Sequence, residues 1–223
     1  MLIELSAALA LAQQCAPGVA PETLLSVVRT ESRFNSLAIN VNSGVKLSRQ
    51  PRTKAEAVRM ARTLLQTGAN FDLGLGQINS KNLGWLKLSI KDAFEPCANL
   101  AAAGRVLTEN YALASRRSSD PQGALRVALS LYNTGDVGRG FRNGYVAKVE
   151  ASAKTVVPAL AVTGAAPPPR EPPAAEASVP EAMAIEDAAV RLQVEPPPPP
   201  SWDIFGRQGG GDRLVFTASQ GGR

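Results

Sequence analysis

Apolar residues recur at intervals of three and four over the first 150 positions, and this spacing predicts amphipathic helices. The pattern predicts a first helix that ends at Cys15, followed by helices that begin near Pro21, Thr53, Pro96 and Asp120. The strict alternation typical of half-buried strands is absent, and only residues 71–79 allow a short β-hairpin. We therefore predict a mainly α-helical domain with one small hairpin.

Local signals support these helix boundaries. Pro21 and Glu22 suit a first helical turn, because proline needs no N–H partner there and a carboxylate favours the positive end of the helix. Thr53 and Glu56 have the spacing of a capping box, and Gly68 is a typical helix stop. The apolar residues between such signals then define an inward face for each helix.

The composition changes beyond about residue 155, where proline becomes frequent and forms an unbroken run at positions 196–200. Such a segment buries too little apolar surface to offset the entropy of ordering, and its proline runs favour extended polyproline II. We expect residues 1–155 to form one domain and residues 156–223 to form a disordered, proline-rich tail. Trp202, Ile204 and Phe205 are either a docking motif for a partner or an isolated apolar cluster.

The amino-acid inventory excludes several kinds of chemistry. The 223 residues include no histidine and two cysteines, which rules out Ser-His-Asp and Cys-His catalysis and a cysteine-rich zinc site. We expect no metal and no cofactor, so an enzyme of this composition works with carboxylates, hydroxyls, amides or lysines. No stretch reaches the roughly 18 apolar residues of a transmembrane helix, so we expect no membrane span.

Charge is distributed unevenly along the chain. Residues 1–150 carry 18 basic and 11 acidic side chains, whereas the chain as a whole has a net charge of +5. A basic surface favours polyanions, and an anionic cell-wall polymer is as compatible as nucleic acid. Because the basic residues are scattered and form no DNA-binding motif, we expect no nucleic-acid partner.

One glutamate stands on an apolar helix face. Leu24, Val27 and Val28 mark the inward face of the second helix, and Glu31 follows on the same face. A carboxyl group withdrawn from water has a raised pKa and can donate a proton near neutral pH. Taken alone, the position of Glu31 favours a helix-end glutamate that bends outward to solvent.

Four short motifs, in order, extend this observation. They are Glu31-Ser32-Arg33-Phe34, Phe71-Asp72-Leu73-Gly74-Leu75-Gly76-Gln77-Ile78-Asn79, Ala128-Leu129-Ser130-Leu131-Tyr132-Asn133-Thr134-Gly135, and Gly144-Tyr145. The ordered set, within roughly residues 15–150, resembles the soluble lytic transglycosylase domain, which has a goose-lysozyme-like helical fold. The second motif resembles the branch that serves type IV secretion and conjugation systems.

Two positions depart from the family pattern. Where the family commonly has a serine, this chain has Asn40, which keeps hydrogen-bonding capacity without a hydroxyl. The usual Gly-Leu-Met-Gln element has Gly76 in place of methionine, so the thioether that would line the groove is missing. These changes bear on substrate detail rather than on the class of reaction.

The resemblance implies cleavage of the β-1,4 bond between N-acetylmuramic acid and N-acetylglucosamine in peptidoglycan, with formation of 1,6-anhydro ends. Glu31 is the implied catalytic acid and base, and the wall would be opened locally for assembly of a type IV secretion system. Tyr145 would orient or desolvate Glu31. The implied substrate-binding residues are Ser32, Phe34, Asn40, Gln77, Asn79, Tyr132, Asn133 and Tyr145.

Two other functions stay open at this point. A lysozyme-type hydrolase would use Asp72 as a second carboxylate beside Glu31, because Asp72 is the acidic residue inside the second motif. A catalytically weak peptidoglycan-binding scaffold would instead recruit secretion components through the tail. For Tyr132 and Tyr145, core packing with a satisfied hydroxyl is the alternative to a role in the site.

The cysteines bear on the compartment. Relatives in the secretion-associated branch carry a similar pair, which implies a disulfide between Cys15 and Cys97; the alternative is two buried thiols in a cytosolic protein. With a peptidoglycan substrate we expect a bacterial periplasmic location. The apolar segment from Leu2 to Ala12 is either the first helix of the fold or the remnant of an export signal, so the export route stays open.

Overall fold

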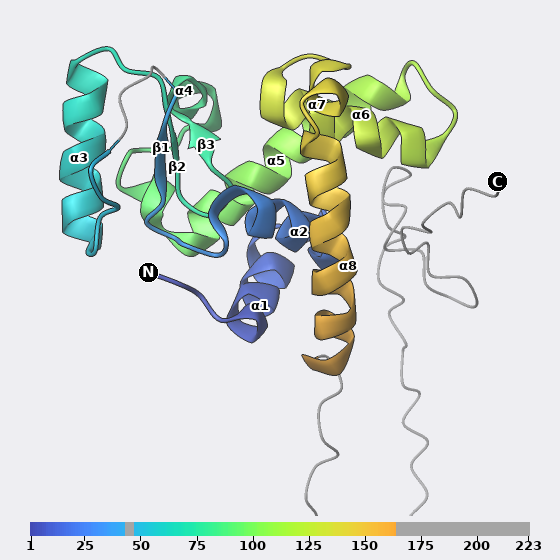
Figure 1. The fold of residues 1–223 in the computed structure, drawn as a ribbon, viewed down its shortest axis with the longest axis horizontal. Helices are drawn as coiled ribbons and strands as arrows, with labels where there is room; N and C mark the ends of the chain where they lie inside the picture. Colours follow the sequence, from blue (N-terminus) through green and yellow to red (C-terminus); the bar gives the residue numbers. More distant parts are fainter. Residues whose placement is uncertain (43–46, 164–223) are drawn as a thin grey trace, which may run out of the picture.

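The computed structural model describes residues 1–42 and 47–163, which form a mainly helical domain around one small sheet (Figure 1). Its α-helices are α1 (Leu5–Cys15), α2 (Pro21–Ser32), α3 (Lys54–Gln66), α4 (Leu83–Leu86), α5 (Pro96–Ser115), α6 (Pro121–Thr134), α7 (Arg139–Arg142) and α8 (Tyr145–Thr163). Its strands are β1 (Ile39–Val41), β2 (Phe71–Leu73) and β3 (Ile78–Asn79), and its 3-10 turns are η1 (Ser80–Asn82) and η2 (Asp92–Phe94). The predicted mainly α fold with a hairpin at residues 71–79 is confirmed.

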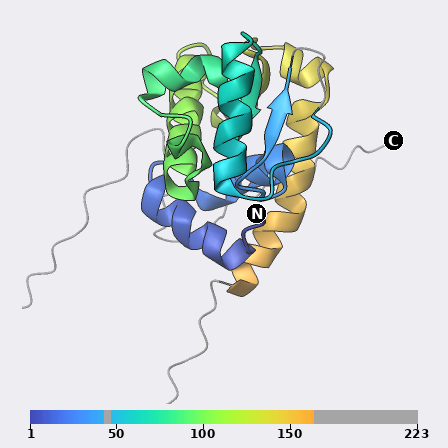
Figure 2. The ribbon, with the colours of Figure 1, turned by 90° about the vertical axis from the view of Figure 1, so that its left-hand side faces the viewer.

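Helix α5 joins the two sides of the domain. Figure 1 shows α3 and the sheet on one side and α6 with α7 on the other, with α5 running between them. The chief helix pairs are α5 with α6, α2 with α8, and α1 with α5. Figure 2 shows α8 extending along the edge of the domain past α1. The C-terminal end of α2 therefore lies near the centre of the domain, where the two sides meet.

The side chains and the glycine that were predicted to begin or end helices lie at helix ends in the structure. Thr53 Oγ1 accepts a hydrogen bond from the Glu56 N–H at 3.2 Å, and Asp120 caps α6 by accepting from the two N–H groups that follow Pro121. The capping box is incomplete, because the Glu56 carboxylate accepts from Arg52 N rather than from Thr53 N. Gly68 has φ +70°, a left-handed conformation that suits a helix stop.

Strand β1 was not predicted from the sequence. The three strands form an antiparallel sheet in the order β1-β2-β3, with Asn40 opposite Asp72 and Asp72 opposite Asn79. β1 has three residues, too few for alternation to be distinguished from a loop. The register places three polar side chains in one row across the sheet, because residues directly opposite each other point to the same face.

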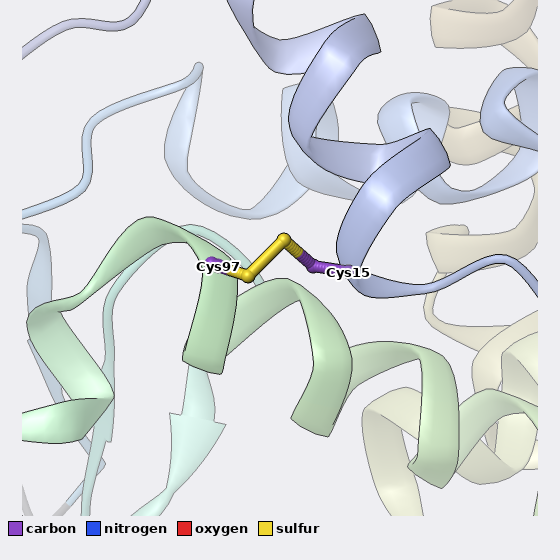
Figure 3. Close-up of a disulfide and its surroundings, with 2 residues drawn as sticks. All are labelled: Cys15 and Cys97. Atoms are coloured by element: carbon purple, nitrogen blue, oxygen red, sulfur yellow. A yellow bond between two sulfur atoms is a disulfide. The ribbon is translucent and has the colours of Figure 1, made fainter.

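A disulfide joins α1 to α5. Cys15 is the last residue of α1, Cys97 lies in the first turn of α5, and their sulfur atoms are bonded (Figure 3). Both cysteines lie at helix ends, as the sequence indicated, so the bridge crosses between elements without interrupting a helix interior. The first helix is thereby tied covalently to the helix that connects both sides of the domain.

The predicted domain boundary at residue 155 falls inside α8. This helix continues to Thr163, and the side chains of Val156 and Leu160 are only 2% and 5% exposed. The sequence prediction placed the boundary at the change in composition near residue 155, whereas the helix continues beyond it and contains Pro158. Residues 164–223, which hold the rest of the predicted tail and its aromatic cluster, lie outside the described residues.

Truncation at two positions tests the corrected boundary. A chain that ends at Thr155 lacks the buried Val156 and Leu160 side chains, and we expect it to lose about 3 kcal/mol of stability. This corresponds to a melting temperature roughly 10 °C lower. A chain that ends at Thr163 is the matched control and should melt like the full-length protein. Equal melting temperatures for the two truncated chains in a calorimetric scan would contradict this boundary.

Within residues 1–42 and 47–163, no helix has both the length and the apolar character needed to cross a membrane. The longest helix, α5, contains charged residues along its surface, including Arg105 and Glu109, which form an i,i+4 ion pair. The described helices instead bury their apolar residues against one another and against the sheet.

Candidate active site

A cleft of about 920 Å³ opens at the C-terminal end of α2. Its walls come from α2, the three strands, η1, α4, α5 and α6, so segments far apart in the sequence meet around it. Most lining side chains are polar, and amides predominate along the sheet. The cleft contains two carboxylates, Glu31 and Asp72.

Glu31 reaches the cleft because the rest of its helix face is buried. Leu24, Val27 and Val28 are fully buried on the face that the sequence pattern predicted, and Glu31 continues that face at the last turn of α2. Burial raises the pKa of the Glu31 carboxyl from 4.5 to about 7, because the charged form is deprived of water. The negative charge of Asp72 raises the same pKa further. Glu31 is therefore protonated in a substantial fraction of molecules at neutral pH.

Tyr145 contacts Glu31 directly. Its hydroxyl donates a hydrogen bond to Glu31 Oε1 at 2.5 Å, across 114 positions of the chain. This bond lowers the pKa of Glu31, since it stabilises the carboxylate, but its effect is smaller than that of burial. Tyr145 is the first residue of α8, and helix packing of α8 against α2 positions the ring.

Asp72 is held by amide side chains on the neighbouring strands. Asn42 Nδ2 donates to Asp72 Oδ2 at 2.8 Å, and Asn79 Nδ2 donates to Asp72 Oδ1 at 2.7 Å. Asn79 Nδ2 also lies 2.7 Å from Asn70 Oδ1, which it donates to. Burial raises the pKa of Asp72, while the two amide bonds oppose this change. The row of amides therefore fixes both oxygens of the Asp72 carboxylate.

The turn between β2 and β3 carries Gln77. Its Nε2 donates to the carbonyl oxygens of Ala38 at 3.2 Å and Gly74 at 2.9 Å, so the side chain braces the turn against the segment before β1. Gln77 itself has φ +50°, and Gly74 has φ +74°, a conformation that glycine adopts without steric cost. With its amide nitrogen engaged, Gln77 can offer the cleft its Oε1 acceptor.

Gly76 explains the missing methionine of the family motif. A Cβ atom at this position would lie 2.7 Å from Ala103 Cβ and 2.9 Å from Tyr132 Oη, so no larger residue fits there. The space is used by Tyr132, whose hydroxyl donates to the Gly76 carbonyl oxygen at 2.7 Å. Tyr132 thus combines a satisfied hydroxyl, as core packing requires, with a place in the wall of the cleft.

A buried asparagine that the sequence interpretation missed organises this turn. Asn99 on α5 is 1% exposed, and its Oδ1 accepts from Gly76 N at 2.7 Å. Its Nδ2 donates to Leu73 O at 3.0 Å and to Ala93 O at 2.7 Å. The signal available in the sequence was a single amide among the small apolar residues of a predicted helix.

The remaining predicted substrate-binding residues differ in placement. Ser32, Asn40 and Asn133 line the cleft, although the Ser32 hydroxyl donates to Val28 O within its own helix at 3.2 Å. Asn133 Oδ1 accepts from Asn143 Nδ2 at 3.0 Å. Phe34 does not line the cleft, because the chain turns at Arg33 and Phe34 with positive φ and the Phe34 ring packs against the core.

Several cleft residues lay outside the sequence prediction. Asn42 follows strand β1, which was not predicted, and Asn70 precedes the predicted hairpin. Lys81, Trp85 and Asn110 belong to no matched motif. Between residues 1 and 42 and between 47 and 163, no group of three His, Cys, Asp or Glu side chains is placed to hold a metal ion. Burial also raises the pKa of two phenols at the site: Tyr132, which lines the cleft, and Tyr145, which contacts Glu31 but does not line the cleft.

Comparison with known proteins identifies the domain. Residues 8–154 match the family model described as the transglycosylase SLT domain. The chain is 44% identical over 150 residues to Protein virB1 of Agrobacterium fabrum. The aligned region covers 67% of this chain and 60% of that protein. The chain is 42% identical over 160 residues to the type IV secretion system protein virB1 of Brucella suis biovar 1. That aligned region covers 69% of this chain and 67% of the Brucella protein.

The match is to part of each relative. The aligned region spans about 60% of the length of the Agrobacterium fabrum protein. No solved structure gives a significant match to this chain. Since the family model matches well over half of the 223 residues and includes Glu31, Asp72, Tyr132 and Tyr145, the chain belongs to the transglycosylase SLT domain family.

Proposed function

We propose that this protein is a peptidoglycan lytic transglycosylase that cleaves the β-1,4 bond between N-acetylmuramic acid and N-acetylglucosamine and leaves 1,6-anhydro-N-acetylmuramic ends. The observation that carries this proposal is Glu31, a carboxyl group with a pKa of about 7 at the wall of a cleft large enough for a glycan strand. Membership of the SLT family supports the same reaction.

In the first step Glu31 acts as the acid. Its carboxyl proton passes to the glycosidic oxygen as the bond to the muramic C1 breaks, so the N-acetylglucosamine side leaves as a neutral hydroxyl. Glu31 becomes a carboxylate at the moment that positive charge develops at C1. The Tyr145 hydroxyl, already bonded to Glu31 Oε1, stabilises this new charge without having to reorient.

In the second step Glu31 acts as the base. The C6 hydroxyl of the same muramic residue attacks C1, and its proton returns to the Glu31 carboxylate, which closes the 1,6-anhydro ring and restores the acid. The nucleophile belongs to the substrate, so it gains from proximity that a free water molecule lacks. One carboxylate can therefore serve both steps.

The relatives suggest a setting for this activity. The Brucella suis relative is named as a type IV secretion system protein, and we place the present protein in the same context, where it opens the wall locally for assembly. Peptidoglycan lies outside the cytoplasm, so the proposed location is the periplasm. The Cys15–Cys97 disulfide is compatible with that oxidising compartment.

Analysis of products tests the reaction. Purified protein is incubated with isolated peptidoglycan, and the released muropeptides are identified by mass spectrometry. The proposal expects ends that are lighter than hydrolysed ends by one water molecule and that lack a reducing group. Reducing ends would establish a hydrolase, and the absence of any product from folded protein that binds peptidoglycan would establish a binding scaffold.

The hydrolase keeps one specific observation in its favour. Asp72 lies in the same cleft as Glu31, close enough for its charge to raise the Glu31 pKa, and a second carboxylate is what activation of water requires. Against this, both Asp72 oxygens already accept hydrogen bonds from Asn42 and Asn79. Asp72→Asn should leave anhydro products unchanged in kind under our proposal, whereas a hydrolase would lose its products.

The pH profile should shift in opposite directions in two variants. Activity needs protonated Glu31, so it should fall as pH rises through about 7. Tyr145→Phe removes a bond that stabilises the carboxylate and should move this alkaline limb to higher pH. Asp72→Asn removes a neighbouring negative charge and should move it to lower pH. Initial rates measured from pH 4 to pH 9 provide the test, and unchanged limbs in both variants would remove Glu31 as the titrating group.

A further inference from the structure

An exposed tryptophan borders the cleft apart from the hydrogen-bonded groups around Glu31 and Asp72. Trp85, on the single turn of α4, is 40% exposed and lines the cleft. Single exposed apolar residues are normal on protein surfaces, so exposure alone does not mark Trp85 as a binding residue. Its position in a concave, mostly polar region sets it apart from Phe141, which is 44% exposed and does not line the cleft.

The indole ring of Trp85 is held in place from below by α5. The Cζ atom of Arg105 lies 4.9 Å from the ring centroid, a cation–π contact. Arg105 Nη1 also donates to the Trp85 carbonyl oxygen at 3.4 Å, and its Nε donates to Glu109 Oε1 at 3.2 Å. The guanidinium of Arg105 is oriented by the indole ring, the Trp85 carbonyl oxygen and the Glu109 carboxylate. It covers one face of the indole, and the rest of the ring borders the cleft.

Two amide side chains line the same cleft as this ring. Asn82 ends η1 just before α4, and Asn110 lies on α5, one turn beyond Val106, which also lines the cleft. In the part of the chain that the structure describes, neither amide side chain makes a hydrogen bond, and both are half-buried. They can therefore offer both donors and acceptors to a ligand bound in the cleft.

This combination matches the chemistry of an N-acetylated sugar. A pyranose ring has an apolar face of C–H bonds that fits against an aromatic ring, and its edge carries hydroxyl and acetamido groups that pair with amides. A glycan strand bound across Glu31 extends in both directions and needs contacts away from the cleaved bond. Trp85, Asn82 and Asn110 supply such contacts without a charge that would repel an anionic polymer.

We propose that Trp85, braced by Arg105, forms a sugar-binding subsite that stacks an N-acetylated pyranose ring of the glycan strand, with Asn82 and Asn110 bonding its polar edge. The proposal rests on the proposed function for the identity of the strand. It adds a positioning residue for the substrate, which acts in binding rather than in proton transfer. Loss of the subsite should therefore raise KM and leave kcat nearly unchanged.

The ring itself can report on binding. Trp85 and Trp202 are the two tryptophans of the chain, so full-length protein with Trp202→Phe has Trp85 as its single indole. Titration with the hexamer of N-acetylglucosamine should produce a saturable change in its fluorescence emission. Cellohexaose, which has the same ring without acetamido groups, should bind more weakly. No saturable change with the N-acetylated hexamer would overturn the subsite.

Calorimetric titration of variants gives a second measurement. Trp85→Ala should bind the N-acetylglucosamine hexamer about tenfold more weakly, because a stacked aromatic contact contributes on that order. Trp85→Phe should restore part of the affinity, and Phe141→Ala, the matched exposed aromatic outside the cleft, should bind like the wild type. Equal affinity in Trp85→Ala and wild type, with both folded, would overturn the proposal.

The two proposals can fail separately. If anhydro products appear but the hexamer leaves Trp85 fluorescence and affinity unchanged, the function stands and the subsite is wrong. If the hexamer binds on Trp85 but no glycosidic bond is cleaved, the subsite stands and the transglycosylase reaction is wrong. Cleavage rates and sugar affinity are measured on the same preparation of full-length protein.

Discussion

Glu31→Gln should reduce cleavage of isolated peptidoglycan by about 100- to 10,000-fold, the range that a positioned general acid contributes. Glutamine has nearly the same shape, and it can still accept the hydrogen bond that Tyr145 donates to Glu31 Oε1. It has no proton to deliver to the glycosidic oxygen and cannot recover one from the attacking hydroxyl. The measurement is the initial rate of release of soluble muropeptides at pH 6, where the wild-type acid is largely protonated.

Stability measurements provide the control for this variant. In the folded protein the pKa of Glu31 is about 7, against an ordinary 4.5, so the folded state binds more protons than the unfolded state between these values. The wild type should therefore lose stability as pH rises from about 4.5 to 7, and Glu31→Gln should lack this loss. We expect the variant to melt above the wild type at pH 8 and to approach it at pH 4. Near-normal activity in the folded variant would remove Glu31 from its role.

Loss of the Cys15–Cys97 disulfide should destabilise the domain about as much as the most damaging single core substitutions. The bridge closes a loop with a sequence separation of 82 residues, for which the chain-entropy model gives about 4–5 kcal/mol. For a domain of this size, that loss lowers the melting temperature by about 10–20 °C. The measurement compares calorimetric scans of the oxidised wild type and the Cys15→Ala, Cys97→Ala double variant.

Two controls separate the crosslink from the side chains. The reduced wild type should melt like the double variant, because both lack the constraint on the unfolded chain. Protein recovered from its native source and denatured without reductant should show no thiol that reacts with a labelling reagent. Two reactive thiols in that protein, or equal melting of oxidised and reduced forms, would contradict a stabilising bridge and weaken the periplasmic assignment.

The helices were predictable because their signals are local. Pro21 at the start of α2, the Thr53 cap of α3 and the Asp120 cap of α6 act through contacts within four residues of the sequence. A periodic apolar face needs no knowledge of what it packs against. The same reasoning predicted that Glu31 follows Val27 and Val28 on a buried face, and the structure places it there.

The boundaries that were mispredicted depend on distant partners. Strand β1 exists because Asn40 and its neighbours pair with β2, some thirty positions later in the chain, and three residues have no periodicity of their own. The last turns of α8 are helical because Val156 and Leu160 are buried against the rest of the domain, which outweighs the local signal of Pro158. In both cases tertiary contacts override local preference.

For the site, the sequence determined the class of residues and the tertiary structure determined their properties. The absence of histidine and the order of the four motifs led to Glu31 as the proposed acid. Burial and the charge of Asp72 raise the Glu31 pKa, and the Tyr145 hydrogen bond lowers it, with a result of about 7. The three residues come from α2, β2 and α8. Electrostatic shifts depend on distances in space and on exclusion of water, and neither is encoded in local spacing.

The same division holds for the cleft as a whole. The sequence by itself determined a helical domain, a chemistry without histidine, and the placement of Cys15 and Cys97 at the ends of predicted helices. Only the tertiary structure decided that Gly76 makes room for Tyr132, that Asn99 anchors the turn before Gln77, and that Trp85 borders the cleft over Arg105. The physical reason is that helix formation depends on neighbours along the chain, whereas a binding site depends on side chains that folding brings together.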